Sequence, residues 1–307
     1  MTTATQVDAA GTPGAFSGDE SAGGRWSEAF RRLRRNPMAI LGAVLVLAFV
    51  FIAIFAPLLA GHDPNDQILL GEVRPGSAPG PRPGFPLGAD QLGRDELSRL
   101  LYGARQSLLV GVVSTLLGLS VGLILGGVAG AFGGRVDNVI MRVCDLLLSI
   151  PGLLTAITIS VILGQSLYSV MIAIAIVNVP IFARLLRGSM LAQRGNDYVL
   201  AAQSIGLRRR TIVLSHVVPN SLGPVIVQAT LTLATSIIDA AALSFLGLGN
   251  PDDTRPEWGQ MLSDAQNLLS TRAALAFYPC IAIVLAALGF TLLGESLREA
   301  LDPKFRR

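Results

Sequence analysis

The sequence predicts an all-α fold, a polytopic membrane bundle of six transmembrane helices, and three observations support that prediction. Hydrophobic residues make up 51% of the 307 residues and charged residues only 15%, a balance that an ordinary soluble domain would not tolerate on its surface. The apolar residues fall in long unbroken runs, without the alternating segments of a membrane barrel. Glycine occurs 33 times, as expected where membrane helices pack through small side chains.

Apolar runs that are long enough to cross a bilayer, which takes about 20 residues, occur at six places. We predict spans at residues 39–60, 108–132, 139–163, 167–186, 221–246 and 273–294. Basic residues gather at 25–35 and 184–219, whereas acidic residues mark the loops at 61–107 and 247–272. The positive-inside rule therefore predicts a multi-pass protein of the cytoplasmic membrane with both termini in the cytoplasm.

These spans divide the chain into five segments. Residues 1–38 are predicted to be a disordered cytoplasmic tail and a basic amphipathic segment at the membrane, with a solvated basic flank as the alternative. The remaining segments are a first transmembrane anchor (39–60), an external loop (61–107), a transmembrane core (108–294) and a cytoplasmic C-tail (295–307). A short helix through residues 95–105 is expected to lead into the second span.

Glycines recur every fourth residue in the second span, at Gly118, Gly122, Gly126 and Gly130. This spacing predicts one glycine face against which a neighbouring helix packs closely. In the third span, Asp145 lies three residues beyond Arg142, so an intrahelical ion pair explains it, with a transport role as the alternative.

Polar residues in the fifth span form one helical stripe. The stripe comprises Gln228, Thr232, Thr235, Ser236 and Asp239, and the opposite face carries Val227, Leu231, Ala234 and Ile238. An unpaired carboxylate near the bilayer centre costs about 3 kcal/mol on insertion scales, so Asp239 should face protein or water. We predict that the stripe lines a hydrated translocation path, and a dry helix interface with hydrogen bonds is the alternative.

The segment 187–219, between the fourth and fifth spans, is unusually long for this chain. Residues 198–205 can form two helical turns that present Val199, Ala202 and Ile205. Gly206 can end these turns in a left-handed conformation, and a second short helix can run to a break at Pro219.

Two short helices joined by a glycine would make a compact protrusion. Its apolar tips and the arginines Arg208, Arg209 and Arg210 suit docking into a groove on a partner protein. A membrane-surface helix held by lipid phosphates is the alternative.

This segment resembles the cytoplasmic signature loop of binding-protein-dependent ABC importer permeases. That pattern is Glu-Ala-Ala, three residues, Gly, nine residues, then Ile-x-Leu-Pro. Ala201, Ala202, Gly206 and Pro219 match it, and His216 begins the last block. The pattern's Glu falls at Leu200, so a polar contact of that Glu with the ATPase is not carried over.

Further blocks make the resemblance closer to the C-type subunit of dipeptide and oligopeptide permeases. These blocks are residues 87–105, 244–249, 258–262, 293–294 and 301–303. The resemblance implies a type I ABC importer permease fold and a non-enzymatic subunit that translocates dipeptides or oligopeptides across the cytoplasmic membrane.

The resemblance also implies partners: a second homologous permease subunit, two cytoplasmic ABC ATPase subunits or domains, and an extracytoplasmic substrate-binding protein. The coupling loop to the ATPases would then comprise Tyr198, Ala201, Ala202, Gly206, Arg208, Arg209, Arg210, His216 and Pro219. ATP and Mg would bind to the partner subunits, with no cofactor, metal or catalytic residue in this chain.

The sequence itself also indicates that ATP binds to other subunits and not to this chain. A phosphate-binding P-loop needs Gly-Lys-Ser/Thr, and Lys304 is the sole lysine. The net charge of +3 is too small and scattered for a nucleic-acid surface. A self-sufficient secondary transporter, coupled to protons through Asp145 or Asp239, is the alternative class, although it would not explain the long cytoplasmic segment.

Overall fold

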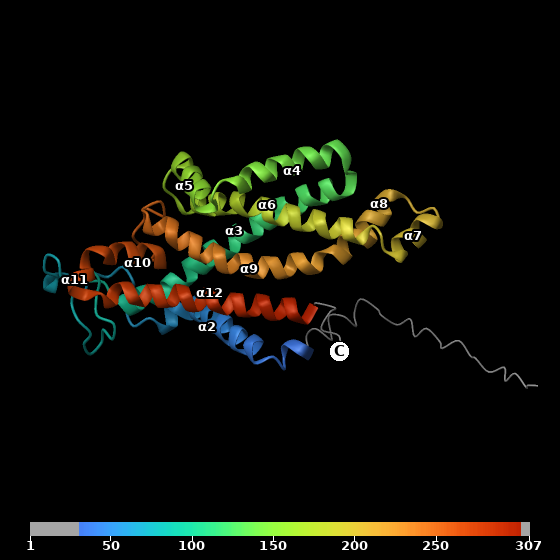
Figure 1. Ribbon diagram of the computed structural model, residues 1–307. Helices are drawn as coiled ribbons and strands as arrows, with labels where there is room; N and C mark the ends of the chain where they lie inside the picture. The colour runs from blue at the N-terminus through green and yellow to red at the C-terminus, as the bar shows by residue number, and fades with distance from the viewer. Residues whose placement is uncertain (1–30, 302–307) are drawn as a thin grey trace, which may run out of the picture.

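The computed structural model describes residues 31–301, and within this range the chain forms an elongated bundle of helices (Figure 1). The disordered tail predicted for the start of the chain and residues 302–307 of the predicted C-tail lie outside the described residues. No β-strand longer than an isolated bridge occurs between residues 31 and 301. The predicted all-α class is therefore confirmed.

Long helices build the body of the molecule. They are α2 (Pro37–Leu59), α3 (Glu96–Phe132), α4 (Gly134–Ser149), α5 (Gly152–Leu163), α6 (Leu167–Gln193), α9 (Val218–Phe245) and α12 (Ala274–Leu301). Among the described residues, five helices are long and apolar enough to cross a membrane, and α4 with α5 supplies a sixth if the pair counts as one span.

Shorter elements lie at the two ends of the bundle. They are η1 (Leu70–Glu72), α7 (Asp197–Ser204), α8 (Arg209–Ile212), the π-helical turn η2 (Val213–Val217), α10 (Trp258–Asp264), η3 (Ala265–Leu268) and α11 (Leu269–Arg272). In Figure 1 the α7–α8 end lies on the right and the α10–α11 end on the left.

Helix α6 lies at the centre of the bundle, because 67% of its most apolar window is buried, against 11% for α2. The glycine face of α3 packs on it, as the fourfold spacing predicted. A Cβ atom added to Gly122 would lie 2.5 Å from the Cβ of Phe182, and one added to Gly126 would lie 2.4 Å from the carbonyl oxygen of Ala183. Only glycine allows this approach of the two backbones.

The peripheral helix α2 begins at the cap residue Asn36, whose side chain accepts a hydrogen bond from the Met38 N–H, with Pro37 in the first turn. This arrangement suits a helix start, since proline lacks the N–H that would stay unpaired there. Gly42 lets α2 approach α12, where its added Cβ would lie 2.9 Å from the Gly289 carbonyl oxygen. Most other α2 side chains are exposed.

The third predicted span is not one straight helix. The chain breaks at Ile150 and Pro151, and the two halves α4 and α5 meet at 94°. Proline disfavours a helical conformation in the residue before it and cannot donate to the preceding turn. The apolar run therefore has the length of a span but changes direction midway.

Helix α3 is also longer than its predicted span. Its 37 residues rise about 55 Å, well beyond a hydrocarbon core of about 30 Å. It starts at Glu96 with Asp95 as its cap, where the Asp95 carboxylate accepts from the Ser98 N–H at 3.0 Å. The short helix expected at residues 95–105 is thus the first part of α3.

Candidate functional site

The knob, which we define as residues 194–217, projects from one end of the bundle and contains α7, α8 and η2 (Figure 1). Helix α7 ends at Ser204, and Gly206 shortly after it has a φ of 78°, which is left-handed as predicted. The Gly206 N–H donates to the Gln203 carbonyl at 3.0 Å and the Leu207 N–H to the Ala202 carbonyl at 3.2 Å. This pair of bonds is the Schellman ending of a helix, which requires a residue that tolerates positive φ.

The two faces of α7 have different surroundings. Val199 and Ala202 are buried and belong to a hydrophobic cluster that also includes Met190 of α6 and Val217. The expectation that both would be presented outward with Ile205 is therefore wrong for these two. Leu200 and Ile205 are the outward apolar side chains, with exposed fractions of 50% and 76%.

The other predicted coupling residues lie on the knob or just after it. Exposed positions include Tyr198, Ala201, Gly206, Arg208, Arg209, Arg210 and Pro219, and His216 is half-buried. The knob thus presents three consecutive arginines beside the apolar tip, and only Ala202 of the predicted set is buried.

The predicted break at Pro219 does not occur. Residues 209–245 form one continuous helical rod, in which Pro219 stands in the first turn of α9 after the π-helical turn. The Val218 N–H bonds to the Val213 carbonyl, five residues back. A π-helical turn takes in one additional residue and accommodates the proline without ending the helix.

The polar stripe of α9 separates into a buried and an exposed part. Thr232 and Ser236 are buried, and the Ser236 hydroxyl accepts from Asn178 of α6 at 3.0 Å and from Thr115 of α3 at 3.1 Å. Three helices are hydrogen-bonded at this point. The other stripe residues are more accessible: Gln228 and Asp239 are half-buried and Thr235 is exposed.

Ile238, which the sequence pattern placed on the face opposite the polar stripe, is also exposed, at 48%. Thr235 and Ile238 are three residues apart and lie on one outward face of α9. The outward face of this helix within the single chain is therefore of mixed polarity, and the pathway assignment stays a prediction.

Asp145 has a different partner from the one that the sequence indicated. Its carboxylate accepts from Arg184 of α6 at 2.5 Å, with both side chains about half exposed. The Arg142 pairing is thus replaced by a contact between α4 and α6. Nearer the knob, Asp137 and Arg187 connect the same two helices through two hydrogen bonds of 2.8 and 2.7 Å.

At the opposite end, residues 61–95 and 250–272 fold over α3 and form what we call the cap (Figure 1). Trp258, the first residue of α10, is 1% exposed and donates its indole N–H to the Leu100 carbonyl at 3.0 Å. Its ring stands edge-on to Phe49 of α2 at 5.6 Å. The block 258–262 therefore anchors the cap on two membrane helices.

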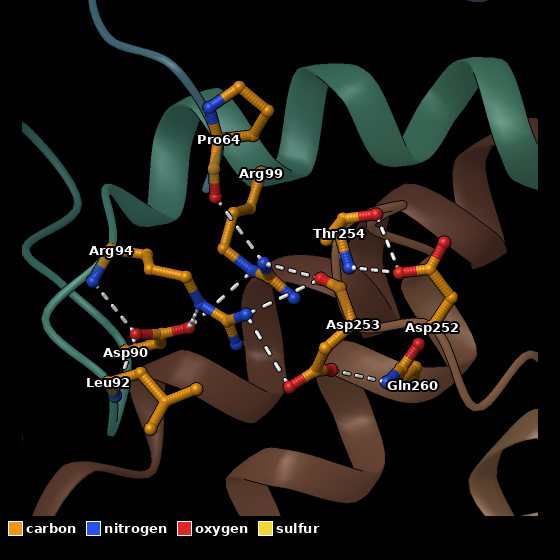
Figure 2. A network of polar contacts seen from close by, with 9 residues as sticks. All are labelled: Pro64, Asp90, Leu92, Arg94, Arg99, Asp252, Asp253, Thr254 and Gln260. Atoms are coloured by element: carbon orange, nitrogen blue, oxygen red, sulfur yellow. Dashed lines mark hydrogen bonds and ion pairs between the residues drawn. The ribbon is translucent and has the colours of Figure 1, made fainter. Parts of the chain in front are cut away.

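A buried ionic network crosses the cap (Figure 2). The Asp90 carboxylate lies 2.7 Å from Arg94 Nε and 3.5 Å from Arg99 Nε, and both arginines are almost fully buried. Both guanidinium groups also donate to the backbone carbonyl of Asp253, in the second segment of the cap. The network joins the loop at 61–95 to the segment that leads into α10.

Two carboxyl groups of the cap have raised pKa values. Burial raises the pKa of Glu257 to about 7, although a hydrogen bond from the Ser244 hydroxyl at 2.9 Å acts in the opposite direction. Burial, together with the nearby Asp253 charge, raises the pKa of Asp264 to about 6. The interior of the cap is therefore dry enough to oppose ionisation of these side chains.

The sequence reasoning assigned no role to this network. Asp90, Arg94 and Arg99 were only part of a matching block. The sequence does contain one local indication of the Asp90–Arg94 ion pair. The two residues are at positions i and i+4, and Gly93 between them has a φ of 74°. An added Cβ at Gly93 would lie 2.3 Å from the Leu70 nitrogen, which shows that this loop is packed closely.

Residues 31–301 contain no cluster of three or more His, Cys, Asp or Glu side chains that could hold a metal ion. A bundle of helices long enough to span a membrane, with a projecting helical knob and a folded cap on the far end, is the architecture of a polytopic membrane protein.

The comparison with known families agrees with this class. The family described as "Binding-protein-dependent transport system inner membrane component" matches residues 122–307, and the "N-terminal TM domain of oligopeptide transport permease C" matches residues 24–75. The chain belongs to the family of binding-protein-dependent transport system inner membrane components and resembles the C-type oligopeptide permeases. It is a multi-pass inner-membrane permease component and not a catalytic enzyme.

Curated relatives match over nearly the whole chain. The dipeptide transport system permease protein DppC of Alkalihalophilus pseudofirmus is 43% identical over 92% of this chain and 90% of that protein. The di/tripeptide transport system permease protein DppC of Pseudomonas aeruginosa is 41% identical over 91% and 92%. The glutathione transport system permease protein GsiD of Escherichia coli O157:H7 is 42% identical over 92% and 91%.

A solved structure shares the fold. A chain of the MetNI methionine ABC transporter, in an inward-facing conformation, superimposes with a TM-score of 0.54 at 20% identity. The match covers 66% of this chain and 97% of that one. The type I ABC importer permease fold is thereby confirmed.

Proposed function

We propose that this chain is the translocation subunit of an ATP-driven importer that carries dipeptides or oligopeptides across the cytoplasmic membrane. The knob is the observation that carries the proposal. It presents an apolar tip at Leu200 and Ile205 beside Arg208 and Arg210, while its inner face is held by the bundle. A protruding helix with an apolar tip suits the groove of a partner protein.

The assembly that we propose contains a second homologous permease, two cytoplasmic ABC ATPase subunits or domains, and an extracytoplasmic substrate-binding protein. The ATPases would bind to the knob and would also bind ATP and Mg, and the binding protein would dock on the cap. The broken helix pair α4–α5 offers an exposed apolar face, with Val139 and Leu146 both above 60% exposed, which suits the second permease or lipid.

The proposed topology places the knob in the cytoplasm. The first described residues of α2 and the last of α12 lie toward the same end of the bundle as the knob (Figure 1), so both termini would be cytoplasmic. The basic residues concentrated there agree with the positive-inside rule.

Peptides are the proposed substrate class because the curated relatives are named for dipeptides, di/tripeptides and glutathione, which is itself a peptide. The 39–43% identity over about nine-tenths of the chain supports this choice.

The pathway would run along the outward face of α9. We expect cysteines at Thr235 and Asp239 to react with a small hydrophilic thiol reagent in the assembled transporter, with a reactivity that changes when ATP is trapped. A cysteine at Ser236, which is fully buried, is the control and should not react. Equal protection of positions 235 and 239 in every nucleotide state would move the path to another helix.

The substitution Gly206→Val tests the role of the knob. A β-branched residue at a φ of 78° carries a strain of about 1–3 kcal/mol, so the Schellman ending of α7 should open. We expect the purified subunit to stay monodisperse in detergent while its affinity for the ATPases falls about fivefold or more, measured by co-purification and titration.

Gly195→Val provides a matched control in the same segment. Gly195, like Gly206, has open space where a Cβ would lie, but its φ is not positive. The control should therefore retain the ATPases. Full ATPase binding by Gly206→Val, or equal losses in both variants, would contradict the proposed docking of ATPases on the knob.

A further inference from the structure

The C-terminal end of α3 holds backbone carbonyls that the helix itself cannot pair. The Gly133 N–H donates to the Ala129 carbonyl at 3.0 Å, and the chain then turns through Gly133 and Gly134, which have φ values of 68° and 58°, into α4. The last carbonyls of a helix need partners from outside it. Here these are the carbonyls of residues 130–132.

Two arginines of the knob donate hydrogen bonds to these carbonyls. Arg194, directly after α6, donates through Nη2 to the Gly130 carbonyl and to the Ala131 carbonyl at 3.0 Å. Arg209, the first residue of α8, donates through Nη2 to the same Ala131 carbonyl at 2.6 Å. Positive charge at the negative end of the helix dipole strengthens both contacts.

Both arginines also line a cavity of about 440 Å³ inside the knob, together with Gln203 and apolar side chains such as Val199 and Ile212. Apolar packing of Ala131 against the hydrophobic cluster of the knob accompanies the two guanidinium contacts. The end of α3 is therefore connected to the knob by arginine hydrogen bonds as well as by apolar side chains.

The turn that receives the arginines is itself tied to the centre of the bundle. Asp137, in the first turn of α4, is held by Arg187 of α6 through two hydrogen bonds. A movement of residues 130–134 would therefore reach α4, which begins at Gly134.

We propose that Arg194 and Arg209 are positioning residues that hold the knob on the end of α3, so that a displacement of the knob is passed to the α3–α4 turn. This inference rests on the proposed function, since the displacement comes from the ATPases. Arg209 thereby has an inward mechanical role that differs from contact with a partner.

The test uses the whole transporter in lipid vesicles. A spin label is placed on α4 at Val136, which is 44% exposed, after Cys144 and Cys280 are replaced by serine. The label response is the change in its accessibility between the nucleotide-free and ATP-trapped states. ATP hydrolysis and retention of the ATPases are measured in the same preparation.

The double substitution Arg194→Met and Arg209→Met keeps the aliphatic stems and removes the donors. We expect hydrolysis to continue and the label response to fall about threefold or more, within the range of coupling changes seen for residues that link two sites. Arg209→Lys alone should keep more of the response than Arg209→Met, because an ammonium can still donate to one carbonyl. Arg142→Met is the control, since the side chain of Arg142 on α4 is exposed and has no hydrogen bond or ion pair within residues 31–301.

An unchanged label response in the double variant would overturn the proposal. Loss of the ATPases from that variant would also overturn it, because the arginines would then serve docking or folding. If the parental complex lacked ATPases, the proposed function itself would fail before any variant is compared, and the proposed role of Arg194 and Arg209 would fail with it.

Discussion

Substitution of Gly126 by alanine is expected to destabilise the bundle strongly, although alanine is the better helix former. The added Cβ would lie 2.4 Å from the Ala183 carbonyl oxygen and 2.9 Å from the Ala183 Cα, so α3 and α6 would have to separate. Overpacking of this kind costs about 1–3 kcal/mol, and these helices form the centre of the protein. Unfolding of the purified subunit in mixed detergent micelles measures the loss.

The neighbouring Gly127 is the matched control. An added Cβ there meets only a methyl group of Leu186, at 3.8 Å, so Gly127→Ala should be neutral or stabilise the helix by up to about 1 kcal/mol. Equal stabilities of the two variants would contradict the close packing of α3 on α6.

Asp90→Ala should open the cap. The substitution leaves Arg94 and Arg99 buried, at 3% and 1% exposure, without the carboxylate that lies between them. Removal of one partner from a buried ionic group costs about 3–5 kcal/mol. We expect faster proteolysis within residues 61–95 and a lower thermal unfolding temperature, whereas Asp90→Asn should lose less because an amide oxygen can still accept from the Leu92 and Arg94 N–H groups, both at 2.9 Å.

Glu72→Ala is the control for the effect of burial. Glu72 and Arg82 approach equally closely, at 2.6 Å, but both side chains are substantially exposed. Exposed ion pairs contribute little because water screens them and replaces the lost contact. Similar proteolysis rates in Asp90→Ala and Glu72→Ala would show that the network does not hold the cap.

The sequence predicted those features that depend on residues close to each other in the chain. The apolar runs indicated the spans, the fourfold glycine spacing indicated the packed face of α3, and Gly206 indicated the left-handed end of α7. Each of these follows from length, period or backbone freedom, which a single segment carries by itself.

Features that depend on distant partners escaped prediction. Ser236 is bonded to Asn178 and Thr115, and no period along α9 indicates which neighbours fill the space beside it. For the same reason the amphipathic pattern of α7 could not tell whether Val199 faces a partner protein or the chain's own core. Hydropathy also records how long an apolar run is and not its direction, so the bend at Pro151 was missed.

The π-helical turn at Val213–Val217 sets the angular phase between the two parts of the 209–245 rod. An α-helix rotates by about 100° per residue, and a π-helical turn takes in one additional residue within a single turn. The sequence positions that share a face in the first part of the rod are therefore offset by one residue from the positions that share that face in the membrane half of α9. An apolar period that is followed along residues 209–212 accordingly does not continue in step into α9.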